Sequence, residues 1–216
     1  MAKINKVRAE EILDSRGMPT VKAIIETESG YIGEASVPSG ASTGSHEALE
    51  LRDGDKTRYN GKGVLKAVKN VEEIIGSGIM GAEVTEQEKI DKIMIELDGA
   101  ENKSKLGANA ILAVSLACAR AGAISQKQEL YQYLRQKFWF KEKAWLMPKP
   151  MMNVLNGGKH AIGSVEMQEF MIVPEGQNFA ESLRIGVEAY QRLKELMLKK
   201  DLGVGVGDEG GFTANF

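Results

Sequence analysis

The chain has 216 residues and a formal net charge of -2, with 43% hydrophobic and 27% charged residues. This length allows one large domain or two small ones with real cores, and the composition is ordinary for a globular protein. The charge argues against general nucleic-acid binding, which needs a basic face. A single cysteine, Cys118, excludes an internal disulfide framework, and one cysteine with two histidines argues against a zinc site.

The N-terminal residues are charged and lack an apolar core, so no signal peptide is expected. No apolar run is long enough to cross a bilayer, because Asn109, Ser115 and Arg120 interrupt the alanine-rich stretch at 108–123. The small residues of that stretch predict a buried helix instead.

Residues 1–135 are predicted to form an α+β domain that opens with a three-stranded antiparallel meander. Residues 20–27 and 31–37 are rich in β-branched residues and flank a Ser-Gly turn, which indicates a hairpin. Residues 4–12 form the third candidate strand, and a turn with Gly17 and Pro19 separates it from the hairpin.

A long loop follows at 38–55, and its first residues are small and polar. Loops of this length inside a compact domain are typical of lids and binding loops. The amides and hydroxyls here, including Ser39, could surround a phosphate, although no Walker sequence is present. A plain mobile loop remains the alternative.

Helices are predicted next. Apolar residues at helical spacing cover 64–75, and a stripe after the candidate capping box of Thr85 and Glu88 ends near 98. Residues 104–123 are predicted to be the central buried helix, with one short helix after it near 130–134. Residues 136–149 run into Pro148-Lys149-Pro150 and are predicted to be an interdomain linker.

Residues 150–216 are predicted to start an α/β barrel. Two apolar runs at 150–155 and 169–173 are typical of strands buried on both faces. Asn178 and Glu181 predict the cap of a helix. A strand near 203–206 then delivers Asp208 and Glu209, and in barrels the loops after strand ends carry the chemistry.

Three glycine-containing loops are candidates for the site: residues 39–45, 156–169 and 207–212. His160 could bind an anion or move a proton, although a lone histidine is more often structural. Glu169 and Glu209 are candidates for an acid/base pair, and the alternative is that both are solvated loop acids. A hard divalent cation is compatible with these oxygen donors, but no complete ligand set is present.

These stretches together resemble enolase (phosphopyruvate hydratase) of the bacterial type along essentially the whole chain. The matching residues are 12–17, 37–44, 50–55, 106–112, 156–158, 168–171 and 207–212. The resemblance implies an α+β domain packed on an enolase-type α/β barrel. It also implies a glycolytic and gluconeogenic lyase that dehydrates 2-phosphoglycerate to phosphoenolpyruvate with Mg²⁺.

The family's site residues carry over by motif. Glu209 resembles the proton donor that helps the C3 hydroxyl leave, and Glu169 resembles its acidic neighbour. His160 would lie on a mobile loop near the phosphate and the leaving group, and Gln168 would contact the substrate. Ser39 resembles the lid residue that ligates the second Mg²⁺. The stretch after His160 departs from the family pattern at Ile162 and Gly163, which bears on how that loop closes.

A full enolase is about twice this length, as a complete barrel with an extra domain requires. The ligands of the first Mg²⁺, the lysine base and the phosphate-binding arginine would all follow Phe216. We therefore expect this chain alone to be inactive, as the N-terminal half of a truncated, split or incompletely recorded enzyme. The resemblance further implies a homodimer in the full-length family, a complementary C-terminal half as a partner, and a cytoplasmic protein with a surface or secreted pool.

Two alternatives of a different class remain. The chain could be a non-enzymatic binding or surface-interaction protein on an enolase N-terminal scaffold. It could also be a phosphate-binding module that uses the loop at 38–55, the Ser39 loop.

Overall fold

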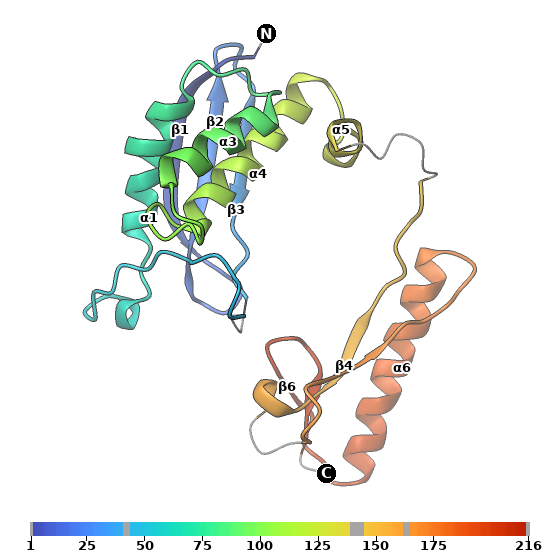
Figure 1. Cartoon of the computed structure of the whole chain (residues 1–216). Coiled ribbons are helices and arrows are strands. Elements are labelled where there is room, and N and C mark those ends of the chain that lie inside the picture. The colour runs from blue at the N-terminus through green and yellow to red at the C-terminus, as the bar shows by residue number, and fades with distance from the viewer. Residues whose placement is uncertain (1, 41–43, 139–144, 162–164, 215–216) are drawn as a thin grey trace. The chain divides into compact units, whose positions relative to one another are not determined.

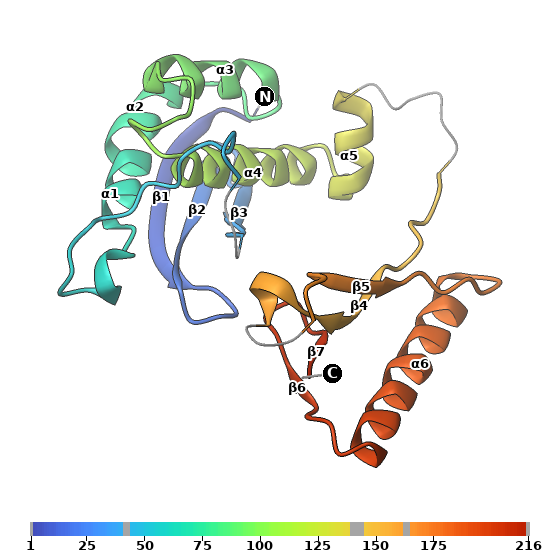
Figure 2. The same ribbon diagram turned by 60° about the horizontal axis from the view of Figure 1, so that its bottom comes forward.

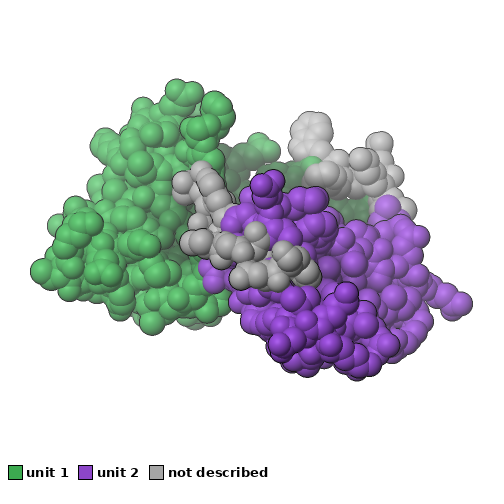
Figure 3. All heavy atoms as spheres, turned by 90° about the horizontal axis from the view of Figure 1, so that it is seen from below, with its two compact units in different colours: residues 1–142 green, residues 143–216 purple. Residues whose placement is uncertain are grey.

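The structure, a computed structural model, describes residues 2–40, 44–138, 145–161 and 165–214. The chain divides into two compact units, Met1–Glu142 (unit 1) and Lys143–Phe216 (unit 2), which Figure 3 shows in different colours. The segment predicted to be a linker, 136–149, spans the boundary between them.

Unit 1 opens with an antiparallel sheet in the order β1-β2-β3, which confirms the predicted meander. Its strands are β1 (Ile4–Leu13), β2 (Pro19–Thr27) and β3 (Ile32–Ser36). The Thr27 amide donates a hydrogen bond to the Tyr31 carbonyl at 3.0 Å, which closes the hairpin between β2 and β3. Gly30 takes a φ of +78° in this turn, a conformation that glycine adopts without steric cost.

The helical segments of unit 1 are, in chain order, the 3-10 helix η1 (Tyr59–Gly61), α1 (Leu65–Lys69), the π-helix η2 (Asn70–Ile75), α2 (Gly76–Ile79), α3 (Gln87–Asp98), α4 (Ala108–Ser125) and α5 (Leu130–Lys137). The segments from α1 to α4 lie on one face of the sheet, as Figures 1 and 2 both show.

Two details of these helices differ from the sequence-based prediction. The prediction of a capping box at Thr85 and Glu88 is wrong, because α3 begins at Gln87 and no side chain caps it. A capping box forms instead at α5, between Glu129 and Gln132. Helix α5 also continues to Lys137, two residues into the segment predicted to be a linker.

The core of unit 1 lies between α4 and the sheet. Val21, Ala23 and Ile25 of β2 are fully buried against it. Helix α4 is long and apolar enough to cross a membrane by length and composition alone, but 61% of its residues are buried inside the structure. Its burial and its small side chains identify it as the predicted central helix.

Helix α4 passes so close to β3 that the contact admits only glycine. A Cβ atom on Gly33 would collide with the Ala117 carbonyl and with the backbone of Ala121. The backbone of α4 thus takes the space that any side chain at position 33 would need.

Unit 2 contains a second sheet in the order β5-β4-β7-β6. Its elements are β4 (Met152–Asn156), the 3-10 helix η3 (Gly158–His160), β5 (Glu169–Ile172), α6 (Phe179–Lys199), β6 (Gly205–Val206) and β7 (Phe212–Thr213). Strand β4 pairs antiparallel with β5 and parallel with β7, and β6 and β7 form a hairpin. The Asn178 cap of α6 is confirmed, since its side chain accepts from the Glu181 amide at 2.9 Å.

One expectation for unit 2 is wrong, and one element is shorter than predicted. Strand β5 is not buried on both faces, because it is an edge strand whose Phe170 and Met171 are 38% and 46% exposed. The predicted strand near 203–206 shrinks to Gly205–Val206, and β7, which was not predicted, lies beside β4. Side chains of α6 pack on β7 around Phe212 and Met197.

We predict that Gly33→Ala lowers the free energy of unfolding of unit 1 by about 2 kcal/mol or more, because overpacking forces α4 away from β3. Urea unfolding followed by circular dichroism measures this. Gly44→Ala is the matched control, since its Cβ would meet only the Glu47 side chain, at 3.7 Å. Equal stability of Gly33→Ala and the wild type would contradict the close contact.

Candidate functional site

The second half of the loop at 38–55 is held on the start of α4 by a buried asparagine. Asn109, only 2% exposed, accepts from the Leu51 amide and donates to the Leu51 carbonyl, both at 3.1 Å. The Ala108 amide also donates to the Leu49 carbonyl at 2.8 Å. The Asn109 side chain thereby pairs with Leu51 as a neighbouring strand would, which satisfies backbone groups that the loop could not pair alone.

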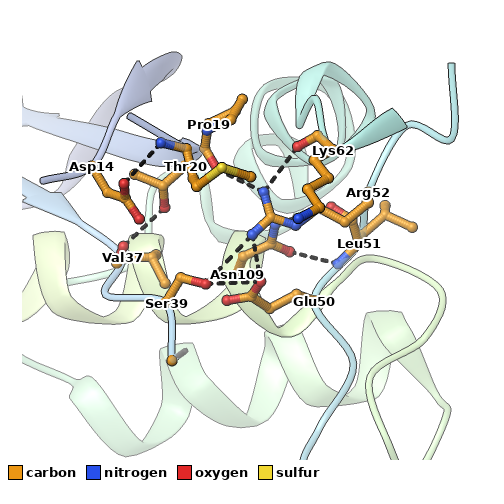
Figure 4. Close-up of polar contacts among 12 residues, drawn as sticks. Asp14, Pro19, Thr20, Val37, Ser39, Glu50, Leu51, Arg52, Lys62 and Asn109 are labelled. Carbon is orange, nitrogen blue, oxygen red and sulfur yellow. Dashed lines mark hydrogen bonds and ion pairs between the residues drawn. The ribbon is translucent and has the colours of Figure 1, made fainter. Parts of the chain in front are cut away.

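Arg52 ties this loop to two other segments (Figure 4). Its guanidinium donates to the carbonyls of Pro19 at 2.6 Å and Lys62 at 2.9 Å. It also pairs with Glu50 at 2.6 Å and lies 3.5 Å from the Ser39 hydroxyl. The hydroxyl of Ser39 in turn donates to Glu50 at 3.3 Å. A planar fork with five donors suits several acceptors at once, which explains why arginine occupies this position.

Arg16 holds the backbone at Ser39 from the opposite side. Its guanidinium donates to the Ser39 carbonyl at 2.8 Å and to the Gly40 carbonyl at 3.3 Å. The carboxylate of Asp14 accepts from the amides of Met18 at 2.9 Å and Arg16 at 2.8 Å, and so shapes the turn that presents Arg16. The Met18 amide above all, together with Arg16, holds the pKa of Asp14 below its ordinary value.

These residues line a surface depression of about 550 Å³ in unit 1. Three cations, Arg16, Arg52 and Lys62, and two carboxylates, Glu47 and Glu50, line it, and Glu50 pairs with Arg52. The depression is therefore polar and partly cationic. Residues 41–43 of the predicted lid lie outside the described part of the chain.

In unit 2, His160 is held between two of the predicted site residues. Its Nδ1 lies 3.2 Å from Oε1 of Glu169, and its Nε2 lies 3.0 Å from Nε2 of Gln168. With the proton on Nδ1, the Nε2 atom can accept from the Gln168 amide. The Nδ1 atom lies near the Glu169 carboxylate but does not meet hydrogen-bond geometry there. Strand β5 begins at Glu169 and η3 ends at His160, so pairing of β4 with β5 brings the two together.

Glu209 lies on the tight turn between β6 and β7. The Gly207 amide donates to the Gly211 carbonyl at 3.0 Å, and the Gly210 amide donates to the Gly207 carbonyl at 2.9 Å. Gly210 has a φ of +81°, which explains the glycine there. Glu209 is exposed and forms no hydrogen bond or ion pair with another described residue. The structure thus joins His160, Gln168 and Glu169, and leaves Glu209 apart from them.

The turn nevertheless rests against the same elements. A Cβ on Gly207 would lie 3.2 Å from the His160 carbonyl, and one on Gly211 would lie 2.5 Å from Oδ1 of both Asn153 and Asn156. Sequence reasoning missed these two asparagines of β4. Their signal was two polar residues inside an otherwise apolar run, which predicts side chains with a specific partner. It also missed Arg52 and Asn109, whose partners are distant in sequence.

The described residues do not by themselves fit Mg²⁺. None of them form a group of three or more His, Cys, Asp or Glu that could hold a metal ion. The predicted ligand Ser39 lies 3.5 Å from the Arg52 guanidinium, whose positive charge disfavours a dication at that hydroxyl. The departure at Ile162 and Gly163 falls outside the described residues.

We predict that Asp14 titrates below the ordinary aspartate pKa of about 3.9. Its lowered pKa means that its contribution to stability is fully present above that pH and is lost as pH falls through the lower folded-state value. The stability difference between wild type and Asp14→Asn should therefore exist near neutral pH and vanish in strong acid. Carboxyl ¹³C titration and urea unfolding measure both, with exposed Glu28→Gln as the control. A midpoint at or above the ordinary value would refute the assignment.

Family models match both parts of the chain. The model described as "Enolase, N-terminal domain" matches residues 4–134, and the model described as "Enolase, C-terminal TIM barrel domain" matches residues 144–216. The three-stranded sheet with its helices is consistent with the first, and β4 to β7 with α6 are consistent with the beginning of the barrel. With more than half of its length matched by the N-terminal model alone, the chain belongs to the enolase family.

Proposed function

We propose that this chain is part of an enolase-family lyase of the bacterial type that dehydrates 2-phosphoglycerate to phosphoenolpyruvate and water, with Mg²⁺ as cofactor. The observation that carries the proposal is the cluster of His160, Gln168 and Glu169 in the segment that matches the barrel model. The Ser39 loop in unit 1 supports it, because Arg16 and Arg52 hold it beside a partly cationic depression suited to a phosphorylated acid.

The chemistry requires a proton to leave C2 and the C3 hydroxyl to depart as water. Glu209 donates a proton to that hydroxyl as general acid, a role that typically contributes about 100-fold or more. Glu169 and His160 form a polar pair that orients the leaving oxygen, and Gln168 adds an amide contact to the substrate. Each role rests on the family motif, to which the His160 contacts in unit 2 add local support.

We further propose that residues 1–216 supply only part of the site. The lysine base and the ligands of the first Mg²⁺ are not assigned to any residue of this chain. Unit 2 also exposes apolar side chains that a larger barrel would cover, since Phe170 is 38%, Phe179 41% and Leu183 42% exposed. A complementary segment that completes the barrel would provide both the cover and the missing groups.

A binding protein built on unit 1 is the second candidate. The observation that favours it is the self-contained core of unit 1, where α4 and the sheet bury their apolar side chains against each other. Homodimerisation and a cytoplasmic location with a surface pool belong to the lyase proposal and are supported by the resemblance alone.

We predict that residues 1–216 alone convert no 2-phosphoglycerate above the uncatalysed rate, and that turnover appears when a complementary C-terminal segment is added. Phosphoenolpyruvate absorbance with Mg²⁺ present measures this. A folded, monodisperse chain that stays inactive with that segment would favour the binding-protein candidate. Robust turnover by the isolated chain would contradict the proposal that the site is incomplete.

In the complemented enzyme, Glu209→Gln should lower kcat by about 100-fold or more with little change in KM, because the amide cannot donate a proton as an acid does. Asp208→Asn is the matched control, since this neighbouring acid is exposed on the same turn. We expect it to retain most of the activity. Full activity of Glu209→Gln would refute the proton-donor role.

A further inference from the structure

We propose that Tyr190 is a positioning residue for the turn that carries Glu209, and that its hydroxyl fixes the conformation of that turn. Tyr190 projects from α6 and donates to the Gly210 carbonyl at 2.8 Å. Gly210 directly follows Glu209, so the bond acts on a carbonyl one residue beyond the acid. The inference rests on the proposed function only for what Glu209 does.

The Tyr190 ring is itself held in place. It stacks on Phe212 of β7, with ring centroids 4.4 Å apart and an interplanar angle of 16°. Phe212 is only 1% exposed and belongs to the core cluster of unit 2, together with Met197 of α6. Stacking fixes the direction of the phenol, so the hydroxyl needs little further ordering to reach Gly210.

The turn that carries Glu209 also packs closely against β4. Gly211 sits against the carboxamides of Asn153 and Asn156, so closely that a Cβ there would lie 2.5 Å from each Oδ1. Asn156 is completely buried. The turn therefore contacts both β4 and the Tyr190 hydroxyl.

Packing and tethering are separable at this position. The ring supplies the stack on Phe212, whereas only the hydroxyl oxygen reaches Gly210. Removing that oxygen leaves the apolar contacts of the ring intact. Tyr190→Phe therefore tests the tether without disturbing the core, and unchanged circular dichroism and thermal midpoint would verify that the fold is kept.

The first test needs no catalytic activity. In the full chain, amide hydrogen exchange at Gly207 and Gly210 should become about threefold faster in Tyr190→Phe, as loss of one modest hydrogen bond allows. The ¹³C shift of the Gly210 carbonyl should move as well. Tyr59→Phe, which removes an exposed hydroxyl from unit 1, should change neither measurement. Equal exchange rates and equal carbonyl shifts in Tyr190→Phe and the wild type would overturn the proposal.

The second test uses the complemented enzyme. Tyr190→Phe should lower kcat by about threefold or more at nearly unchanged KM, because the acid is displaced from its position. In the Glu209→Gln background the same substitution should have no further effect, since Tyr190 acts through Glu209. A loss that persists in that background would overturn the positioning role. If the complemented enzyme shows no turnover, the proposed function fails, and the exchange measurement still decides the tether.

Discussion

The approach of helix α4 to strand β3 is the contact on which unit 1 depends. Because the backbone of α4 passes directly over Gly33, the helix fills the concave face of the sheet with small side chains rather than large ones. The same helix carries Asn109 at its first turn, which pairs with Leu51. The position of the helix therefore also decides where the Ser39 loop runs, and core packing and site geometry are two consequences of one contact.

The polar groups of the Ser39 loop show how a long irregular segment can be ordered without secondary structure. Carbonyls at its start accept from Arg16, and the backbone of Leu51 pairs with the side chain of Asn109. Arg52, which belongs to the loop, donates to the carbonyls of Pro19 and Lys62. Charged donors give stronger bonds than neutral ones, so a few side chains replace a strand. The arrangement also places the guanidinium groups of Arg16 and Arg52 in the lining of the depression.

Unit 2 places its acids in two different environments. Glu169 contacts the imidazole of His160 at the start of β5, while Glu209 sits exposed on a turn clamped by Tyr190 and two asparagines. The proton-donor role proposed for Glu209 needs an acid that is accessible yet held in one place, and an exposed acid on a turn with several contacts is compatible with both needs. The exposed apolar side chains of β5 and α6 mark the faces against which a complete barrel would pack.

The sequence by itself determined the local elements and the family. Alternating β-branched residues predicted the meander, small apolar residues predicted α4, and Asn178 predicted its cap, because these signals depend on neighbours along the chain. Its motifs also predict His160, Gln168, Glu169, Glu209 and Ser39 as site residues, and these roles stay predictions. Only the tertiary structure decided that β7 lies beside β4, that β5 is an exposed edge, and that Asn109, Arg52 and Tyr190 hold the loops. Those contacts join residues far apart in the chain, and no local pattern encodes which distant carbonyl a side chain will meet.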